Sequence, residues 1–428
     1  MCGARILLAA LLVFASVARA QDPYNLIGCI TAIQHSGAFD IEGIHILFTP
    51  TTKFRTHTGS FSTAPASRPA TYYLGESIEA VGVLDNFSHT LTASRITLVP
   101  AKPASVRGIA IIDLIPSVAA TQPASDRTIR ADGFLLHITA KTKLNFAAPL
   151  TSIADIATNQ WVDYSGVQQL DGTVLLDYAG IGPNKVSHME DWIRTKVDYD
   201  PAAVSDDAHQ SGVSKAFIGV DPRKIPPYRD AAMQARVQRI GESLIPAYQR
   251  ALPASDPNKI NFRFQVIDST KWRDAASLSN GIILVPRQVV ERMQNDDQLA
   301  AVLADNIAET IEKDTLHITS TYTKVVGAEV AGDVAGIFLP GAGLATLFAG
   351  GKVSAHGYTL ALQQSGRVSL CFLHDAGYDI TQAPLAWWLL ASKSVKPIEQ
   401  VPIPPRADTL YIVLGTTWNP IAEASRLP

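Results

Sequence analysis

The N-terminal half of the chain repeats one pattern of short strands and glycine turns. Between Tyr24 and Pro100, β-branched and polar residues alternate in short segments that Gly, Asn and Asp separate, as in a small β-barrel or β-sandwich. The following segment has matching residues in the same order. The corresponding pairs are Gly28 and Gly108, Gly43 and Gly133, Thr52 and Thr142, and Gly82 and Gly166. Four ordered correspondences predict a duplicated β module.

The predicted modules resemble the small OB-like β modules of secreted bacterial envelope proteins. This resemblance implies a fold and no particular chemistry. We place module 1 at residues 21–100 and module 2 at residues 101–184. The fold class expected for this half is therefore all-β, as two small barrel-like or sandwich-like units.

Charge excludes some classes of partner. The chain has 428 residues, with 36 basic and 39 acidic side chains and a net charge of −3. Nucleic-acid-binding proteins and polybasic membrane-surface proteins carry a clear excess of positive charge. We therefore expect no nucleic-acid partner.

The first 20 residues predict a cleavable secretory signal. Arg5 supplies the positive charge, Ile6 to Ala18 form an apolar run of 13 residues, and Ala18-Arg19-Ala20 provides small residues at the cleavage site. An uncleaved anchor is the alternative, but a bilayer span needs about 20 apolar residues. We expect cleavage after Ala20 and a periplasmic or secreted protein.

Two cysteines remain after removal of this leader. Cys29 and Cys371 lie at opposite ends of the chain and could pair in an oxidising compartment. Cys371 falls in the apolar stretch Val368–Leu373, which favours a buried free thiol. The sequence leaves the pairing open.

The second half of the chain changes from strands to an α+β pattern. A polar connector spans 185–227, an α+β domain 228–400, and a C-terminal strand (Thr409–Leu414) with its tail 401–428. Hydrophobic periodicity predicts the secondary structure of the α+β domain. The expected elements are a helix over 228–252, strands over 262–267 and 281–285, and helices over 288–293 and 297–313.

This order of elements resembles the zinc metallopeptidases of the CAAX-protease and HtpX type. Their metal-binding helix has the pattern D-x-L-A-x-V-L-A-H-E-x-x-H, and the stretch from Asp297 to Glu309 reads DQLAAVLADNIAE. Asn280–Val285, Asp375–Asp379 and Trp387-Trp388 also fit the family. The resemblance covers residues 228–392 and implies a mainly helical, zincin-like domain.

The catalytic residues of that family are absent. In H-E-x-x-H the two histidines lie on one helical face and bind zinc, while the glutamate activates a water molecule. Here Asp305 and Glu309 replace the histidines, and Asn306, which cannot accept a proton, replaces the base. Leu362 stands where the resemblance places the third ligand. We therefore expect no zinc, no other cofactor and no catalytic residue.

One alternative keeps a metal ion in the cleft. Asp305 and Glu309 could bind a harder cation together with His317, His356 or Asp314. The simpler interpretation is that these acids face solvent or pair with a neighbouring donor. Loss of the metal is the favoured interpretation.

Three functional hypotheses follow. The first is an exported pseudopeptidase whose cleft binds a protein or peptide. The second is an active metalloendopeptidase with a non-standard metal site, and the third an envelope interaction protein that acts through its β modules. The uncharged segment 334–351 is expected to cover the cleft as a loop, with a membrane-dipping hairpin as the alternative.

Overall fold

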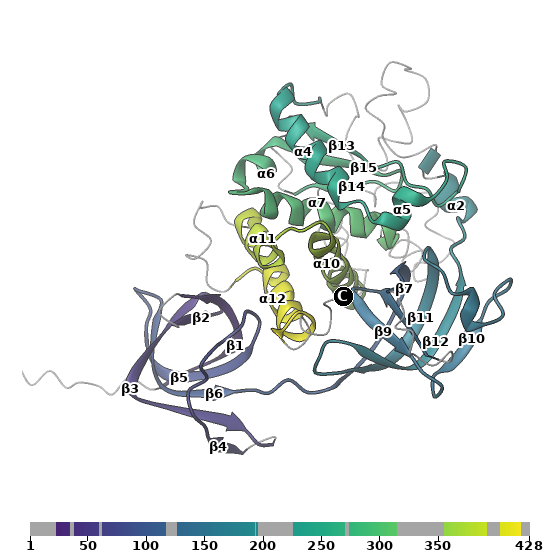
Figure 1. Ribbon diagram of the computed structural model, residues 1–428. Helices are drawn as coiled ribbons and strands as arrows, with labels where there is room; N and C mark the ends of the chain where they lie inside the picture. The colour runs from purple at the N-terminus through teal and green to yellow at the C-terminus, as the bar shows by residue number, and fades with distance from the viewer. Residues whose placement is uncertain are drawn as a thin grey trace, which may run out of the picture.

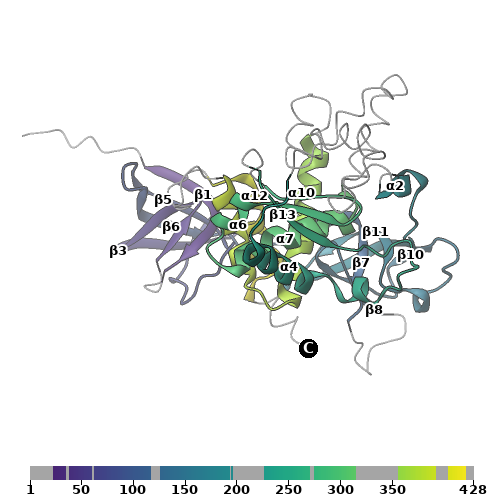
Figure 2. The same ribbon diagram turned by 90° about the horizontal axis from the view of Figure 1, so that it is seen from above.

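A computed structural model shows two β modules on either side of a helical domain (Figures 1 and 2). The structure describes residues 23–420 except 35–37, 60–61, 117–125, 193, 196–225, 270–273, 315–354 and 392–402. The predicted signal, the segment 334–351 and His317 lie outside the described residues. The side chains of His356 and Leu362 are also outside them. No described helix has the length and apolar character of a membrane span.

Module 1 is a closed barrel. Its strands are β1 (Tyr24–Ile33), β2 (Phe39–Ile41), β3 (Ile44–His57), β4 (Thr63–Pro65), β5 (Ser77–Asp85) and β6 (Thr90–Leu98). They pair in the order β2-β1-β5-β6-β3, and β2 also pairs with β3, which closes the ring. All neighbours in this ring are antiparallel except β3 and β6. Alternate apolar side chains point inward and form a separate core.

Module 2 has the same topology. Its strands are β7 (Ala104–Leu114), β8 (Arg127–Ala131), β9 (Phe134–Ile138), β10 (Lys143–Phe146), β11 (Gln160–Gln168) and β12 (Val174–Pro183). The order is β8-β7-β11-β12, and β9 pairs with both β8 and β12 to close the ring. The pairing of β12 with β9 and β10 is parallel, as that of β3 with β6 is in module 1. Both modules thus have the strand order of the OB fold, a five-stranded Greek-key barrel.

The corresponding residues of the two modules make the same contacts. The pairing register shifts after Val81 in the β5–β6 pair and after Ser165 in the β11–β12 pair, with the extra residue in β6 and β12, and the next residue in each case is the matched glycine. The matched threonines also agree. The Oγ1 of Thr52 donates to the Ala93 carbonyl at 2.6 Å, and that of Thr142 donates to the Leu176 carbonyl at 2.9 Å.

The helical domain surrounds one long buried helix, α7 (Asp296–Ile311). Asn295 caps its first turn, and apolar side chains occur all around it, as expected of a helix with no solvent face. α7 packs against α4 (Ala231–Leu244), α10 (Ala355–Asp375) and α11 (Ala383–Ala391). A small sheet of order β13-β15-β14 lies beside it (Figure 1). Its strands are β13 (Arg263–Ile267), β14 (Ala276–Ser277) and β15 (Ile282–Pro286).

Most predicted elements of this domain agree with the structure. The expected strands are β13 and β15, and the expected helices after them are α6 (Arg287–Arg292) and α7. The helix predicted over 228–252 is broken at Pro246, so that α4 is followed by the short helix α5 (Ala247–Ala251). The connector begins with another short helix, α2 (His188–Trp192).

The prediction of a C-terminal strand is wrong. Residues 409–414 belong to the helix α12 (Pro405–Thr417). Their β-branched and aromatic residues suggested a strand, but the buried positions recur at helical spacing and a proline occupies the first helical position. α12 packs against α10, α11 and β1, and this burial outweighs the local β propensity.

Candidate functional site

Two acidic side chains of α7 lie where the H-E-x-x-H resemblance places the histidines. Asp305 and Glu309 are one helical turn apart and therefore share a face of the helix. The side chain of Asp305 is 1% exposed and that of Glu309 is 17% exposed. Two acids so close together and so deeply placed require a positive partner.

Arg406, from the first turn of α12, supplies this positive charge. Its Nη2 binds Asp305 Oδ2 and lies 3.7 Å from Glu309 Oε1, while its Nη1 lies 3.3 Å from Oδ2 of Asp274. The guanidinium also lies 3.4 Å from the ring centre of Trp387, as a cation–π pair. One guanidinium thus bridges the two α7 acids and a third carboxylate.

Asn306 is not arranged as a general base. Its amide nitrogen donates to the Val302 carbonyl of its own helix at 2.8 Å, and the residue is 2% exposed. Leu362 lies on α10, which packs against α7. The described residues do not fit a zinc ion, because carboxylates replace the imidazoles and a guanidinium lies between them.

The charges of this cluster do not cancel when every group is ionised, since three carboxylates face one guanidinium. Burial and repulsion from Asp305 raise the pKa of Glu309 to about 8. Burial also raises the pKa of Asp274 to about 6, although Arg406 opposes this change. Burial alone would lower the pKa of Arg406, but the three acids outweigh it and raise that pKa. Near neutral pH, Glu309 therefore carries a proton in much of the population.

A polar cleft opens on the β14 side of Glu309. It encloses about 10 Å³, roughly the room of one water molecule, and about 240 Å³ when the open space at its mouth is counted. Glu309 accepts a hydrogen bond at 2.9 Å from the hydroxyl of Ser277 in β14. The lining side chains come from the connector just after α2, from β14 and the turn after it, and from the last turn of α7 and the residues that follow. They are Arg194, Ser277, Leu278, Ser279, Glu309, Thr310 and Lys313.

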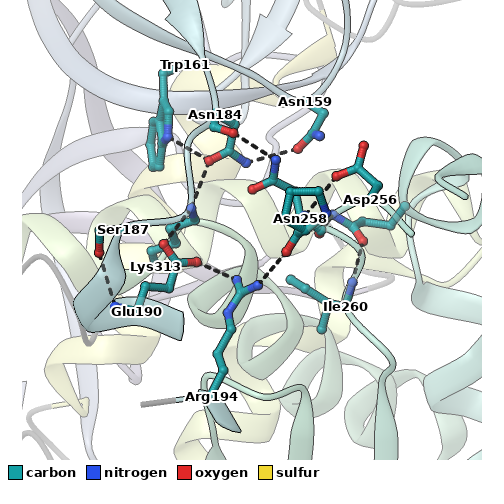
Figure 3. Close-up of polar contacts among 12 residues, drawn as sticks. Asn159, Trp161, Asn184, Ser187, Glu190, Arg194, Asp256, Asn258, Ile260 and Lys313 are labelled. Atoms are coloured by element: carbon teal, nitrogen blue, oxygen red, sulfur yellow. Dashed lines mark hydrogen bonds and ion pairs between the residues drawn. The ribbon is translucent and has the colours of Figure 1, made fainter. Parts of the chain in front are cut away.

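A buried polar network joins two lining residues of this cleft, Arg194 and Lys313, to the connector and module 2 (Figure 3). Lys313, just after α7, binds Glu190 at 2.9 Å and the side-chain oxygen of Asn184 at 2.8 Å. Glu190 also pairs with Arg194 at 2.6 Å. Trp161 of module 2 donates to the same oxygen of Asn184 at 3.0 Å. The network fixes the two basic side chains at the edge of the cleft.

The structure describes only some of the residues of the alternative metal site. Asp314 is buried, and repulsion from Glu309 and Asp305 adds to the effect of burial in raising its pKa. It does not form a compact set of metal-binding atoms with them in the described part of the chain. Arg406, Asp274 and Ser277 were not predicted as site residues from the sequence. Arg406 was missed because its helix was predicted as a strand, and the other two because no motif includes them.

A comparison with known protein families finds a match for module 1. Residues 27–97, which span β1 to β6 of module 1, match a family described only as a domain of unknown function (DUF5666). No curated protein matches the chain. The family match describes module 1 and assigns no activity to the helical domain.

Proposed function

We propose that the helical domain is a pseudopeptidase of zinc-metallopeptidase descent that binds a peptide or protein segment without cleaving it. The observation that carries this proposal is the guanidinium of Arg406 between Asp305 and Glu309. A fixed cation there compensates the acids but offers no exchangeable site for water or a carbonyl oxygen. In this proposal the protein is exported and acts in the cell envelope or outside the cell.

The edge strand beside the cleft is suited to an extended peptide. β14 is an edge strand, and among the described residues it pairs only with β15. An extended segment can add to such an edge through main-chain hydrogen bonds. Side chains of the bound segment would then reach Glu309, Thr310 and Lys313 in the cleft.

A bulky side chain introduced at the cleft tests this proposal. Fluorescein-labelled tryptic peptides of casein are titrated with the full chain, and fluorescence anisotropy reports binding. We expect saturable binding by the wild type and at least a tenfold weaker affinity for Ser279→Trp, because the indole occupies the cleft. Ser105→Trp, on an exposed position of β7, is the matched control and should bind as the wild type does.

Two results would oppose the proposal. Equal binding by Ser279→Trp would place the peptide elsewhere, such as on the β modules. Cleavage of casein in the presence of zinc, manganese, calcium or magnesium, lost in the variant with both Asp305→Ala and Glu309→Ala, would establish the active alternative.

A further inference from the structure

A second group of side chains with metal-binding chemistry lies between module 1 and α12. It consists of Cys29 from β1, Glu42 from the β2–β3 turn and Asp408 from the first turn of α12. The Cys29 sulfur is 3.6 Å from Glu42 Oε1 and 3.9 Å from Asp408 Oδ1. The sulfur and one oxygen of each acid all lie within 4.8 Å of one another.

The sequence of module 1 is adapted to this arrangement. A side chain at Gly28 would collide with Glu42, so the glycine allows the acid to fold over β1 toward Cys29. The Cys29 backbone N–H donates to the Glu42 carboxylate at 3.1 Å and fixes its position. Cys29 itself is 5% exposed and belongs to the core of the helical domain.

Module 2 carries an acid at the position equivalent to Glu42, and there the acid is paired with a cation. Asp132 of module 2 occupies the same turn as Glu42, and Gly108 gives it clearance as Gly28 does for Glu42. Asp132 meets a cation of the helical domain, because Arg367 of α10 binds it at 2.5 Å. Both acids therefore face the helical domain from equivalent places, but among the described residues only Asp132 has a basic partner there.

Module 1 presents its acid to another acid and a thiol. Among the described residues, no ion pair joins Cys29, Glu42 or Asp408 to a lysine, arginine or histidine. Burial raises the pKa of all three groups, and Glu42 and Asp408 raise that of Cys29 further. Module 2 obtains a cation from Arg367. Among the described residues, no cation has the same role beside Cys29, Glu42 and Asp408.

We propose that Cys29, Glu42 and Asp408 bind a zinc ion that joins module 1 to the first turn of α12. Zinc accepts thiolate sulfur at about 2.3 Å and carboxylate oxygen at about 2.0–2.2 Å, so tetrahedral ligands lie about 3.5 Å apart. The observed sulfur-to-oxygen separations are close to this spacing. Glu42 and Asp408 are half-buried, which leaves room for water as a fourth ligand.

Binding this ion releases protons and orders α12. The thiol of Cys29 loses its proton to solvent as the sulfur–zinc bond forms, and the carboxylates bind in their ionised forms. Affinity therefore increases with pH. Asp408 lies two residues after Arg406, so the ion would fix the turn that presents the guanidinium to the cleft.

Zinc binding by the intact chain tests this site. Wild type, Cys29→Ser, Asp408→Asn and Cys371→Ser are saturated with zinc chloride, dialysed without chelator and measured by elemental mass spectrometry. We expect about one zinc per chain in the wild type and in the control Cys371→Ser, which changes the other buried cysteine. Cys29→Ser and Asp408→Asn should retain at least tenfold less.

Cobalt gives a second readout that needs no variant. Cobalt(II) added to the wild type should produce the near-ultraviolet charge-transfer band of a thiolate ligand, and zinc should remove it. An absent band, or zinc retained equally by Cys29→Ser, would overturn the proposal. An unchanged rate of Cys29 alkylation in the presence of zinc would also overturn the proposal.

Discussion

At the scale of single residues, one guanidinium determines how three carboxylates are tolerated. Arg406 is mostly buried and contacts Asp274, Asp305 and Glu309. Removing one partner of a buried ion pair costs more than the pair contributes, because the remaining charge is left in a poorly solvated place. The stability of the cleft should therefore depend strongly on Arg406.

Replacing this arginine should destabilise the protein. For Arg406→Ala we expect a loss of about 2–4 kcal/mol in the free energy of unfolding at pH 7, measured by urea denaturation. The loss should be smaller at pH 5, where Glu309 and Asp274 are protonated. Arg95→Ala removes a longer, partly exposed pair with Glu79, at 3.7 Å, and should change stability by less than about 1 kcal/mol. Equal effects of the two variants would contradict the assigned role of Arg406.

The raised pKa of Glu309 predicts how stability changes with pH. The folded chain holds this proton to about pH 8, while the unfolded carboxyl loses it near the ordinary value of 4.5. The stabilisation is complete below pH 4.5 and is lost as pH rises toward 8, by up to about 1 kcal/mol per pH unit. Glu309→Gln stays neutral, so its free energy of unfolding should fall less steeply between pH 5 and 8. Parallel curves for the two proteins would show that Glu309 is ionised throughout.

At the scale of elements, α12 connects the cleft to both modules. Its first turn carries Arg406 toward α7 and Asp408 toward module 1. Near its end, Gly415 lies against the backbone of Gly75, while Gln168 of module 2 donates to the Thr416 carbonyl at 3.1 Å. The close approach of the helix to module 1 requires glycine on both sides.

A methyl group at this contact should reverse the usual effect of alanine in a helix. Alanine stabilises an open helical position by about 1 kcal/mol relative to glycine. Gly415→Ala should instead lower the free energy of unfolding by about 1–3 kcal/mol, because its Cβ would collide with Gly75. Thr416→Ala, at an exposed neighbouring position, is the control. A gain in thermal stability for Gly415→Ala would mean that the helix and module 1 are not in contact.

The sequence predicted elements well where local pattern and burial agree. The prediction of α7 was correct because a cap, helical spacing and length all favour one structure. The prediction of a strand in place of α12 was wrong because its β-branched residues favour a strand locally, while contacts with distant elements decide its structure. Without this helix, Arg406 could not be placed at the site, although it is the main feature there. Asp274 and Ser277 reach the site only through tertiary packing, which no local spacing reveals.

At the scale of the whole molecule, the two modules hold the helical domain through different chemistry. Module 2 docks through two ion pairs: Arg130, which Asp113 of the same module holds at 2.7 Å, binds Asp375 of α10 at 2.5 Å, and Arg367 of α10 binds Asp132. Module 1 docks through backbone contact with α12 and through the cluster at Cys29. The repeat was evident in the sequence because turns and bulges need particular residues, but the partners of each copy were not.

Loss of one ion pair should loosen module 2 before the rest of the molecule unfolds. Arg367→Ala leaves Asp132 buried, 3% exposed, without its cation and should cost about 3 kcal/mol. Calorimetry should then show module 2 melting earlier, as a separate transition. Arg263→Ala, on an exposed position of β13, serves as the control. A single transition at an unchanged temperature would contradict this view of the interface.

The most direct test of the account restores the metal ligands with and without Arg406. Asp305→His, Asn306→Glu, Glu309→His and Leu362→Glu are combined in a Cys29→Ser chain, which removes the second proposed site, and zinc is counted by elemental mass spectrometry. We predict about one zinc per chain only after Arg406→Ala is added, since the guanidinium otherwise occupies the position between residues 305 and 309. Equal zinc binding with Arg406 in place, or none in either protein, would contradict the claim that Arg406 has replaced the metal of a metallopeptidase cleft.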